Sequence, residues 1–197
     1  MAVNPELLER LQAALRDDDV FRVVIRGFAV LEDALEGRIR EALVQPLAGI
    51  GSASFRRKLD LAVALGFLEP AHRPRFQDLA TLRNDLTHGK IDPETVTAEM
   101  MEALYERLQS QTGMQPFAPP RPGPAAWAGL AIATAFLVVE SGATVARQIR
   151  EAEQEALRRA LSTQSLATLL GNDLARAAGR RPGSPRSRAP DDTSDAT

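Results

Sequence analysis

An arginine, an asparagine and a histidine stand close together in the segment between residues 81 and 89. Arg83 and Asn84 are adjacent, and His88 follows Asn84 after three residues. An imidazole moves protons near neutral pH, and a guanidinium group offers several donors to an anionic phosphate. These groups suit metal-independent RNA cleavage, in which the ribose 2′-OH attacks the adjacent phosphate and the 5′-oxygen leaves. Arg83, Asn84 and His88 are therefore candidate catalytic residues.

Helix geometry limits what one copy of this segment can do. Arg83 and His88 are five residues apart, or about 140° around a helix axis, whereas Asn84 and His88 share a face. A second proton-transfer group is missing, because the only other histidine, His72, is expected at the surface near the helix start. A symmetric dimer that joins two such helix ends would supply one. The alternative is structural, since cations near a helix C-terminus commonly cap it.

Charged residues on two other expected helices could support these groups. Glu32 and Glu36 lie four residues apart on one helix face, where they could meet a cation from a neighbouring helix, including the motif arginine. Arg56, Arg57 and Lys58 form a basic cluster on a first helical turn, which is an unfavourable end for cations. The cluster is consistent both with a solvated helix face and with an anion-binding face. We take Glu32 and Lys58 as supporting residues, and Arg56 and Arg57 as candidate nucleic-acid or phosphate contacts.

The elements that must position these residues are helices. Apolar residues recur at steps of three and four over the segments 5–15, 20–43, 55–65, 70–88 and 92–109. Asn4, Asp19 and either Ser52 or Ser54 are suited to cap the first three helices, and Gly89 is suited to end the fourth. Five such helices predict an all-α, up-and-down bundle that has a core of its own.

The composition divides the chain into four parts. We expect the bundle over residues 1–112, and the five prolines and two glycines of residues 113–124 predict a linker. Residues 125–178 predict a C-terminal helical extension that ends in a weak separate helix over 165–178. Residues 179–197, rich in arginine, proline, serine and aspartate, predict a disordered tail.

An uncharged run opens the C-terminal extension. Residues 125–139 carry no charge, and the apolar pattern reaches residue 146 only if Glu140 is tolerated. A membrane span takes about 20 apolar residues, and a carboxylate inside it is costly. We therefore favour a hydrophobic helix packed on the bundle or on another subunit, with a membrane anchor over 125–146 as the alternative.

The composition of the whole chain excludes several classes of site. The 197 residues include no cysteine, so disulfides and thiolate metal sites are ruled out, and without zinc spacing or a phosphate-binding glycine loop we expect no metal and no cofactor. The formal net charge of −2 gives no global basic field of the kind that marks nucleic-acid binding. Residues 54–90 nevertheless carry seven Lys or Arg against four Asp or Glu. No signal peptide is evident, and we expect a cytoplasmic protein.

The order of these motifs resembles that of the HEPN superfamily of helical domains, and more narrowly that of the mannitol operon repressor (MltR) family. The resemblance covers roughly residues 15–110 and rests on the signature Arg-Asn-x-x-x-His at 83–88 together with features upstream of it. These features are a helix with an acidic centre at Glu32, a loop with Gly49 and Gly51, Ser54-Phe55, Lys58-Leu59 and Ala-Leu-Gly at 64–66.

The resemblance implies a helical bundle that often pairs through its motif-bearing helices. In many HEPN proteins the arginine and the histidine are catalytic residues of metal-independent endoribonucleases, including toxins and defence effectors. The repressor branch is associated with transcriptional control, and here no basic DNA-reading helix is evident. We therefore expect a homodimeric regulatory protein that acts through protein partners. The alternative is a ribonuclease that cleaves RNA with Arg83 and His88 across a dimer interface, as a toxin held by an antitoxin or as a defence component.

Overall fold

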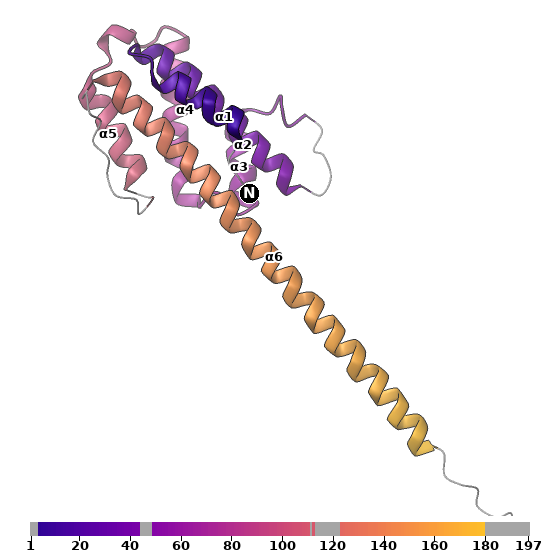
Figure 1. The fold of residues 1–197 in the computed structure, drawn as a ribbon. Coiled ribbons are helices and arrows are strands. Elements are labelled where there is room, and N and C mark those ends of the chain that lie inside the picture. The colour runs from indigo at the N-terminus through magenta and orange to yellow at the C-terminus, as the bar shows by residue number, and fades with distance from the viewer. Residues whose placement is uncertain (1–3, 44–48, 111, 113–122, 180–197) are drawn as a thin grey trace, which may run out of the picture. The chain divides into compact units, whose positions relative to one another are not determined.

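The structure, a computed structural model, describes residues 4–43, 49–110, 112 and 123–179, with side chains as far as residue 159. Within these residues it is all-α, with six α-helices, two 3-10 turns and no strand (Figure 1), which confirms the predicted fold class. The chain divides into a first unit, Met1–Arg150, and a second unit, Glu151–Thr197. The predicted linker, apart from its last two residues, and the predicted tail beyond residue 179 lie outside the described residues.

The helices form close to where the apolar periodicity predicts them. Their bounds are α1 Pro5–Leu15, α2 Val20–Ala42, α3 Phe55–Ala64, α4 Arg73–Thr87, α5 Ala98–Gln109 and α6 Pro124–Gly179. The 3-10 turns η1, Pro70–His72, and η2, Pro93–Thr95, precede α4 and α5 and replace the first turns that we predicted for those helices. The side chains of Asn4, Asp19 and Ser54 accept backbone hydrogen bonds at the starts of α1, α2 and α3, as expected.

The helix α2 is the centre of the first unit. It packs against α1, α3 and α4, and its side chains Leu31, Leu35 and Ile39 are completely buried. Its apolar face is wide enough to contact helices on several sides, because residues at both three- and four-residue steps along it are apolar. This arrangement places Glu32 and Glu36, on the remaining face of α2, at the edge of the core near α3 and α4.

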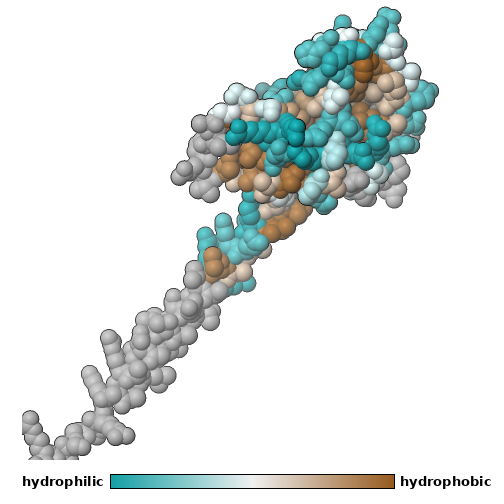
Figure 2. Space-filling view, turned by 180° about the vertical axis from the view of Figure 1, so that it is seen from behind, coloured by the Kyte–Doolittle hydropathy of each residue, from teal (hydrophilic) through white to brown (hydrophobic). Residues whose placement is uncertain are grey.

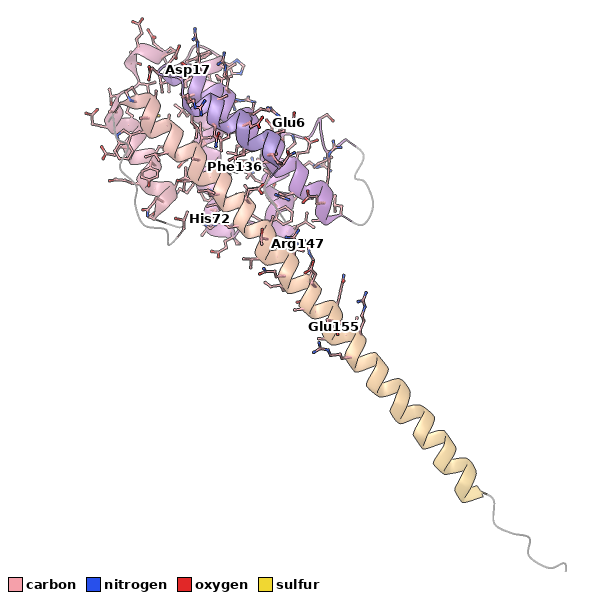
Figure 3. The ribbon with its side chains drawn as sticks, viewed as in Figure 1. Glu6, Asp17, His72, Phe136, Arg147 and Glu155 are labelled. Carbon is pink, nitrogen blue, oxygen red and sulfur yellow. The ribbon has the colours of Figure 1, made fainter. Side chains whose placement is uncertain are left out.

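The first part of α6 belongs to the same core, which places the start of the predicted extension inside the first unit. Phe136 is 1% exposed and lies on the stretch of α6 that runs along the other helices (Figure 3). Glycines permit close approach: a Cβ on Gly27 of α2 would lie 2.8 Å from Ile132 of α6, and one on Gly142 would overlap the carbonyl oxygen of Phe67. Because of this packing, the division of the chain falls after Arg150 and not at the predicted linker.

A buried ion pair ties α6 to α2. The Nε atom of Arg38 donates to Oε1 of Glu140 at 3.0 Å, its Nη2 donates to Oε2 of the same carboxylate, and its Nη1 donates to Glu41 at 2.7 Å. The hydrogen bonds that Arg38 donates to Glu140, and then to Glu41, raise the pKa of Arg38 even though burial opposes the charge. We predicted that Glu140 would end the apolar run. It instead lies inside the helix, where Arg38 compensates its charge. The apolar pattern could not reveal this, because Arg38 is 102 residues away in the sequence.

Two further sequence predictions concern α6. The helix predicted separately over 165–178 is the end of α6, which continues from the first unit into the second without a break. Within the described residues, one helical stretch, Pro124–Arg159, is long and apolar enough to cross a membrane by length and composition, and 56% of its most apolar window is buried inside the protein. The favoured prediction, a helix packed on the bundle, agrees with this burial.

His72 is not at the surface, as we predicted, but is 7% exposed. Residues 70–72 form the tight turn η1, in which three residues complete a turn, so the positions that face inward differ from those of an α-helix. The turn packs on α4 and brings the imidazole in toward the core.

Candidate functional site

The motif occupies the last turn and a half of α4, where Gly89 ends the helix. Gly89 has φ +65°, a left-handed conformation that glycine adopts without a Cβ clash. The backbone N–H of Lys90 then donates to the carbonyl of Asp85 at 2.8 Å, and that of His88 donates to the carbonyl of Asn84 at 2.9 Å. These bonds satisfy carbonyls that the helix end would leave open, so the backbone around the motif is firmly held.

Arg83 is bound on three sides by groups of its own chain. Its Nη1 donates to Oδ1 of Asn84 at 2.8 Å, and its Nη2 lies 3.7 Å from a carboxylate oxygen of Glu32. Its guanidinium carbon lies 5.1 Å from the ring centroid of Phe28, within cation–π distance. The ring of Phe28 contacts that of Phe55, at 4.6 Å between centroids. The arginine therefore connects α4 to the centre of α2, where Phe28 in turn contacts the start of α3.

Lys58 is the buried member of this site. Its side chain is 3% exposed, and its Nζ lies 2.9 Å from Oε1 of Glu32 and 2.9 Å from Oε2 of Glu36. Glu36 also accepts a hydrogen bond from Arg40 at 2.6 Å. This confirms that Glu32 and Glu36 meet a cation from a neighbouring helix. Charges of opposite sign therefore alternate along a chain of ion pairs, and we call its five residues the charge cluster. In order along the chain of pairs they are Arg83, Glu32, Lys58, Glu36 and Arg40.

The charge cluster shifts the protonation equilibria of two of its members. Burial by itself would lower the pKa of Lys58, but its hydrogen bonds to Glu32 and Glu36 outweigh that effect and raise the pKa. The hydrogen bond from Lys58 lowers the pKa of Glu36, with help from Arg40 and against the effect of burial. Both shifts favour the charged forms of Lys58 and Glu36, so this pair is held as an ion pair.

The lowered pKa of Glu36 makes the first unit sensitive to acid. The stability that the folded carboxylate contributes is present above the unfolded pKa, near 4.5, and is lost as the pH falls through the folded pKa. We expect the wild-type chain to lose more unfolding free energy between about pH 6 and about pH 3 than the Glu36→Gln variant. Urea unfolding at each pH measures this. Glu9→Gln, at an exposed position, is the control and should follow the wild type.

His88 is separated from the rest of the motif. It is exposed at the end of α4, and among the described residues its imidazole takes part in no hydrogen bond or ion pair. The five-residue spacing places Arg83 and His88 about 140° apart around the helix, so they point to opposite flanks. Arg83 faces α2 and α3, whereas His88 shares a flank with Thr81 and Asp85 at steps of four and three. The structure thus joins Arg83 to Asn84 by a side-chain hydrogen bond, but among the described residues it does not bring the His88 imidazole to Arg83.

Arg56 and Arg57 lie at the surface on the first turn of α3. Their neighbour Phe55 contacts Phe28, which lies under Arg83, so this turn belongs to the same end of the first unit as the motif. Only Lys58 of the three basic residues turns inward. The exposed pair is placed where it could contact an anion.

The sequence interpretation missed the buried pair of Arg38 and Glu140. A signal was present, because a lone carboxylate at the end of fifteen uncharged residues is costly unless a cation meets it. Around this pair lies a small cavity of about 170 Å³, whose lining includes Asn4, Leu7 and Gly37. In the described part of the chain, no three or more His, Cys, Asp or Glu side chains gather in a way that could hold a metal ion.

The sequence matches no protein-family profile, and neither a curated protein nor a solved structure gives a significant match to it.

Proposed function

We propose that this chain is a cytoplasmic regulatory or interaction protein of the mannitol-operon-repressor (MltR) type, with a HEPN-like bundle, that acts as a homodimer through protein partners. The observation that carries the proposal is the engagement of Arg83. A catalytic arginine must present free donors to the phosphate. This guanidinium is contacted by Asn84, Glu32 and the ring of Phe28, while 37% of the side chain stays exposed. Its contacts favour a role in joining helices.

The charge cluster supports the same role. Lys58 is buried between two carboxylates, so it offers no charge to a ligand in solvent. Together the five side chains fasten α2, α3 and α4 at the motif end and give that end of the first unit a fixed surface. A rigid surface with compensated charge suits a protein partner better than it suits a polyanion.

A genetic experiment tests the regulatory role. We expect deletion of the gene to change the transcript levels of neighbouring genes, and we expect a chain that carries His88→Ala to restore them, because the proposal needs no catalysis. Quantitative measurement of those transcripts decides the matter. Unchanged transcripts after deletion would count against a regulatory protein, and failure of the His88→Ala chain alone would point to chemistry at the motif.

A second candidate function is a metal-independent endoribonuclease, as a toxin or defence component, and the exposure of His88 favours it. The imidazole is open to solvent at the end of α4, and Arg56 and Arg57 are exposed at the same end of the first unit. In a dimer, a second copy could supply the arginine that one copy keeps apart from His88.

The two candidates differ in a direct assay on RNA. We expect the purified chain to leave single-stranded RNA intact in the presence of EDTA, because Arg83 is engaged within its own chain. Gel analysis of the RNA after incubation measures this. Cleavage with cyclic-phosphate ends that His88→Ala abolishes and that Lys90→Ala, a neighbouring exposed control, preserves would establish the ribonuclease instead.

A further inference from the structure

The second unit consists, within the described residues, of residues 151–179 of α6. The side chains of residues 151–159 are all exposed, and the hydrogen bond of 3.0 Å from Arg159 to Glu155 joins neighbours on the same helix. Such local pairs add little stability, and a helix in a protein draws most of its stability from the packing of an apolar face. An apolar face on this stretch would therefore be a contact surface.

One face of this stretch holds a continuous row of uncharged positions. Each residue turns the helix by about 100°, so residues at steps of three and four share a face. The uncharged positions within about 60° of one line along the helix are 152, 156, 160, 163, 166, 167, 170, 174, 177 and 178. We call this row of positions the α6 stripe. Arg159 is the one charged residue within the same limits, and it lies toward the edge of the stripe.

Exposed hydrophobic side chains are concentrated on α6. Among the described residues, four of the six large hydrophobic side chains that remain exposed belong to this helix, namely Leu137, Val145, Ile149 and Leu157. The space-filling view in Figure 2 shows hydrophobic side chains among hydrophilic ones along the coloured part of α6. The helix therefore offers more unpartnered apolar surface than any of the helices α1 to α5.

The α6 stripe changes from small to large residues along its length. Thr163 lies at its middle, and the positions three, seven and eleven residues away from Thr163 are alanine on the N-terminal side and leucine on the C-terminal side. The alanines are Ala160, Ala156 and Ala152, and the leucines are Leu166, Leu170 and Leu174. Helices pack closely when small residues meet large ones, so each half of the stripe has the composition that suits the other half.

A twofold axis at Thr163, perpendicular to the helix, satisfies this pattern with two copies of the same chain. The axis sets a second helix antiparallel to the first and brings every alanine position of one copy level with a leucine position of the other. A parallel pair would instead set alanine beside alanine and leucine beside leucine. The size pattern of the stripe is thus complementary to itself in the antiparallel arrangement.

The charges beside the stripe also favour the antiparallel pair. In a parallel pair the acidic turn formed by Glu151, Glu153 and Glu155 would run alongside its own copy. In the antiparallel pair, residues 171–175 come level with that turn, and they contain one acidic residue, Asp173. A lipid surface is a poorer match, because it attracts a helix with a basic polar face. Residues 151–179 carry four acidic residues against three arginines.

We propose that two copies of this chain form a dimer through the α6 stripe, with the helices antiparallel and Thr163 of each copy at the twofold axis. The proposal rests on the proposed function in that it assigns a surface to its homodimer. It places the contact on α6 and not on the motif helix α4, so the dimer requires neither Arg83 nor His88.

Oxidative cross-linking of the full-length chain tests the arrangement directly. The chain contains no cysteine, so one introduced cysteine reports on one position. We expect Thr163→Cys to form a disulfide-linked dimer under mild oxidation, because the two copies of this position meet at the axis. Ser165→Cys is the matched control, because it lies only two residues further on but about 200° around the helix, and it should not cross-link.

A mixture of two single-cysteine chains tests the direction of the helices. Chains carrying Ala152→Cys and Leu174→Cys should cross-link to one another, because these positions come level in the antiparallel pair. The Ala152→Cys chain alone should not cross-link, since its two copies then lie about 33 Å apart along the helix axis. Cross-linking of Ala152→Cys with itself would show a parallel pair and would overturn the proposal.

Sedimentation over a range of concentrations measures the affinity without cysteines. We expect the wild type to dimerise and Ala156→Glu to weaken the dimer at least about tenfold, because it buries an unpaired carboxylate in the stripe. Gln154→Glu adds the same charge at an exposed position on the opposite face and should leave the dimer unchanged. Far-ultraviolet circular dichroism confirms that each variant keeps its helix content.

A wild-type chain that stays monomeric at all concentrations would overturn the proposal, and so would a dimer that Ala156→Glu does not weaken. In either case the α6 stripe would not be the contact between copies of this chain. The RNA and transcript experiments use changes at His88 and of the whole gene, and none of them alters the stripe. Failure of this surface and failure of the proposed function are therefore separate results.

Discussion

Replacement of Gly142 by alanine is expected to destabilise the first unit by about 2–3 kcal/mol. An added Cβ would overlap the carbonyl oxygen of Phe67 and lie 2.9 Å from its carbonyl carbon. These are backbone atoms, which cannot rotate away as a side chain can, so α6 or the segment after α3 must shift. The loss exceeds the gain of up to about 1 kcal/mol that alanine brings to a helix interior. Urea unfolding, with the midpoint and the slope both recorded, measures the change.

Gly37 provides the matched control for this substitution. It also lies within a helix, α2, but a Cβ there would have no heavy atom within 4 Å. Gly37→Ala should therefore keep the gain in helix propensity and stabilise the chain by about 0.5–1 kcal/mol. The difference between the two variants isolates the cost of the overlap. If Gly142→Ala proved as stable as Gly37→Ala, α6 would not be packed against Phe67 in solution.

Lys58→Met is expected to cost about 3 kcal/mol of unfolding free energy. The substitution keeps the length of the side chain but leaves the carboxylates of Glu32 and Glu36 without their shared cation. The two carboxylates then repel one another at the edge of the core. The expected cost lies at the lower end of the range for broken buried pairs, because the side chains of Glu32 and Glu36 are 24% and 20% exposed.

A rescue experiment separates loss of the charge pairing from loss of packing. Addition of Glu32→Gln and Glu36→Gln to Lys58→Met removes the two carboxylates that repel one another, so we expect most of the lost stability to return, although the partly exposed Arg40 and Arg83 then lose their carboxylate partners. Arg57→Met, one residue earlier and exposed, should change the unfolding free energy by less than about 0.5 kcal/mol. If the triple variant were no more stable than Lys58→Met alone, packing of the lysine stem would account for the loss.

The local part of the fold was predictable because its causes lie close together in the sequence. Asn4, Asp19 and Ser54 each cap a helix through atoms two or three residues away, and Gly89 ends α4 through its own φ angle. Periodicity located the apolar faces, although the exact starts were missed where 3-10 turns intervene. For example, the predicted helix over residues 92–109 begins as an α-helix only at Ala98, where Thr97 is its cap.

The long-range part was not predictable, because a side chain's burial depends on partners that periodicity does not reveal. Lys58 was expected to be a supporting residue, but its burial depends on two carboxylates of α2, 22 and 26 residues earlier in the chain, and the sequence did not reveal that pairing. The membership of α6 in the core depends on Arg38, which compensates Glu140 across 102 residues. For the motif, the sequence indicated the separation of Arg83 and His88 through helix geometry, but it could not show that Phe28 and Glu32 hold the arginine.

The continuity of α6 has a consequence for how its second half stays helical. A helix is hard to start in water, because the first turn fixes several residues for a single hydrogen bond, whereas each added residue extends it at little cost. The packed stretch around Phe136 supplies that first turn from within the core. Residues 151–179 therefore extend a helix that has already been nucleated, and their order depends on the folding of the bundle that precedes them.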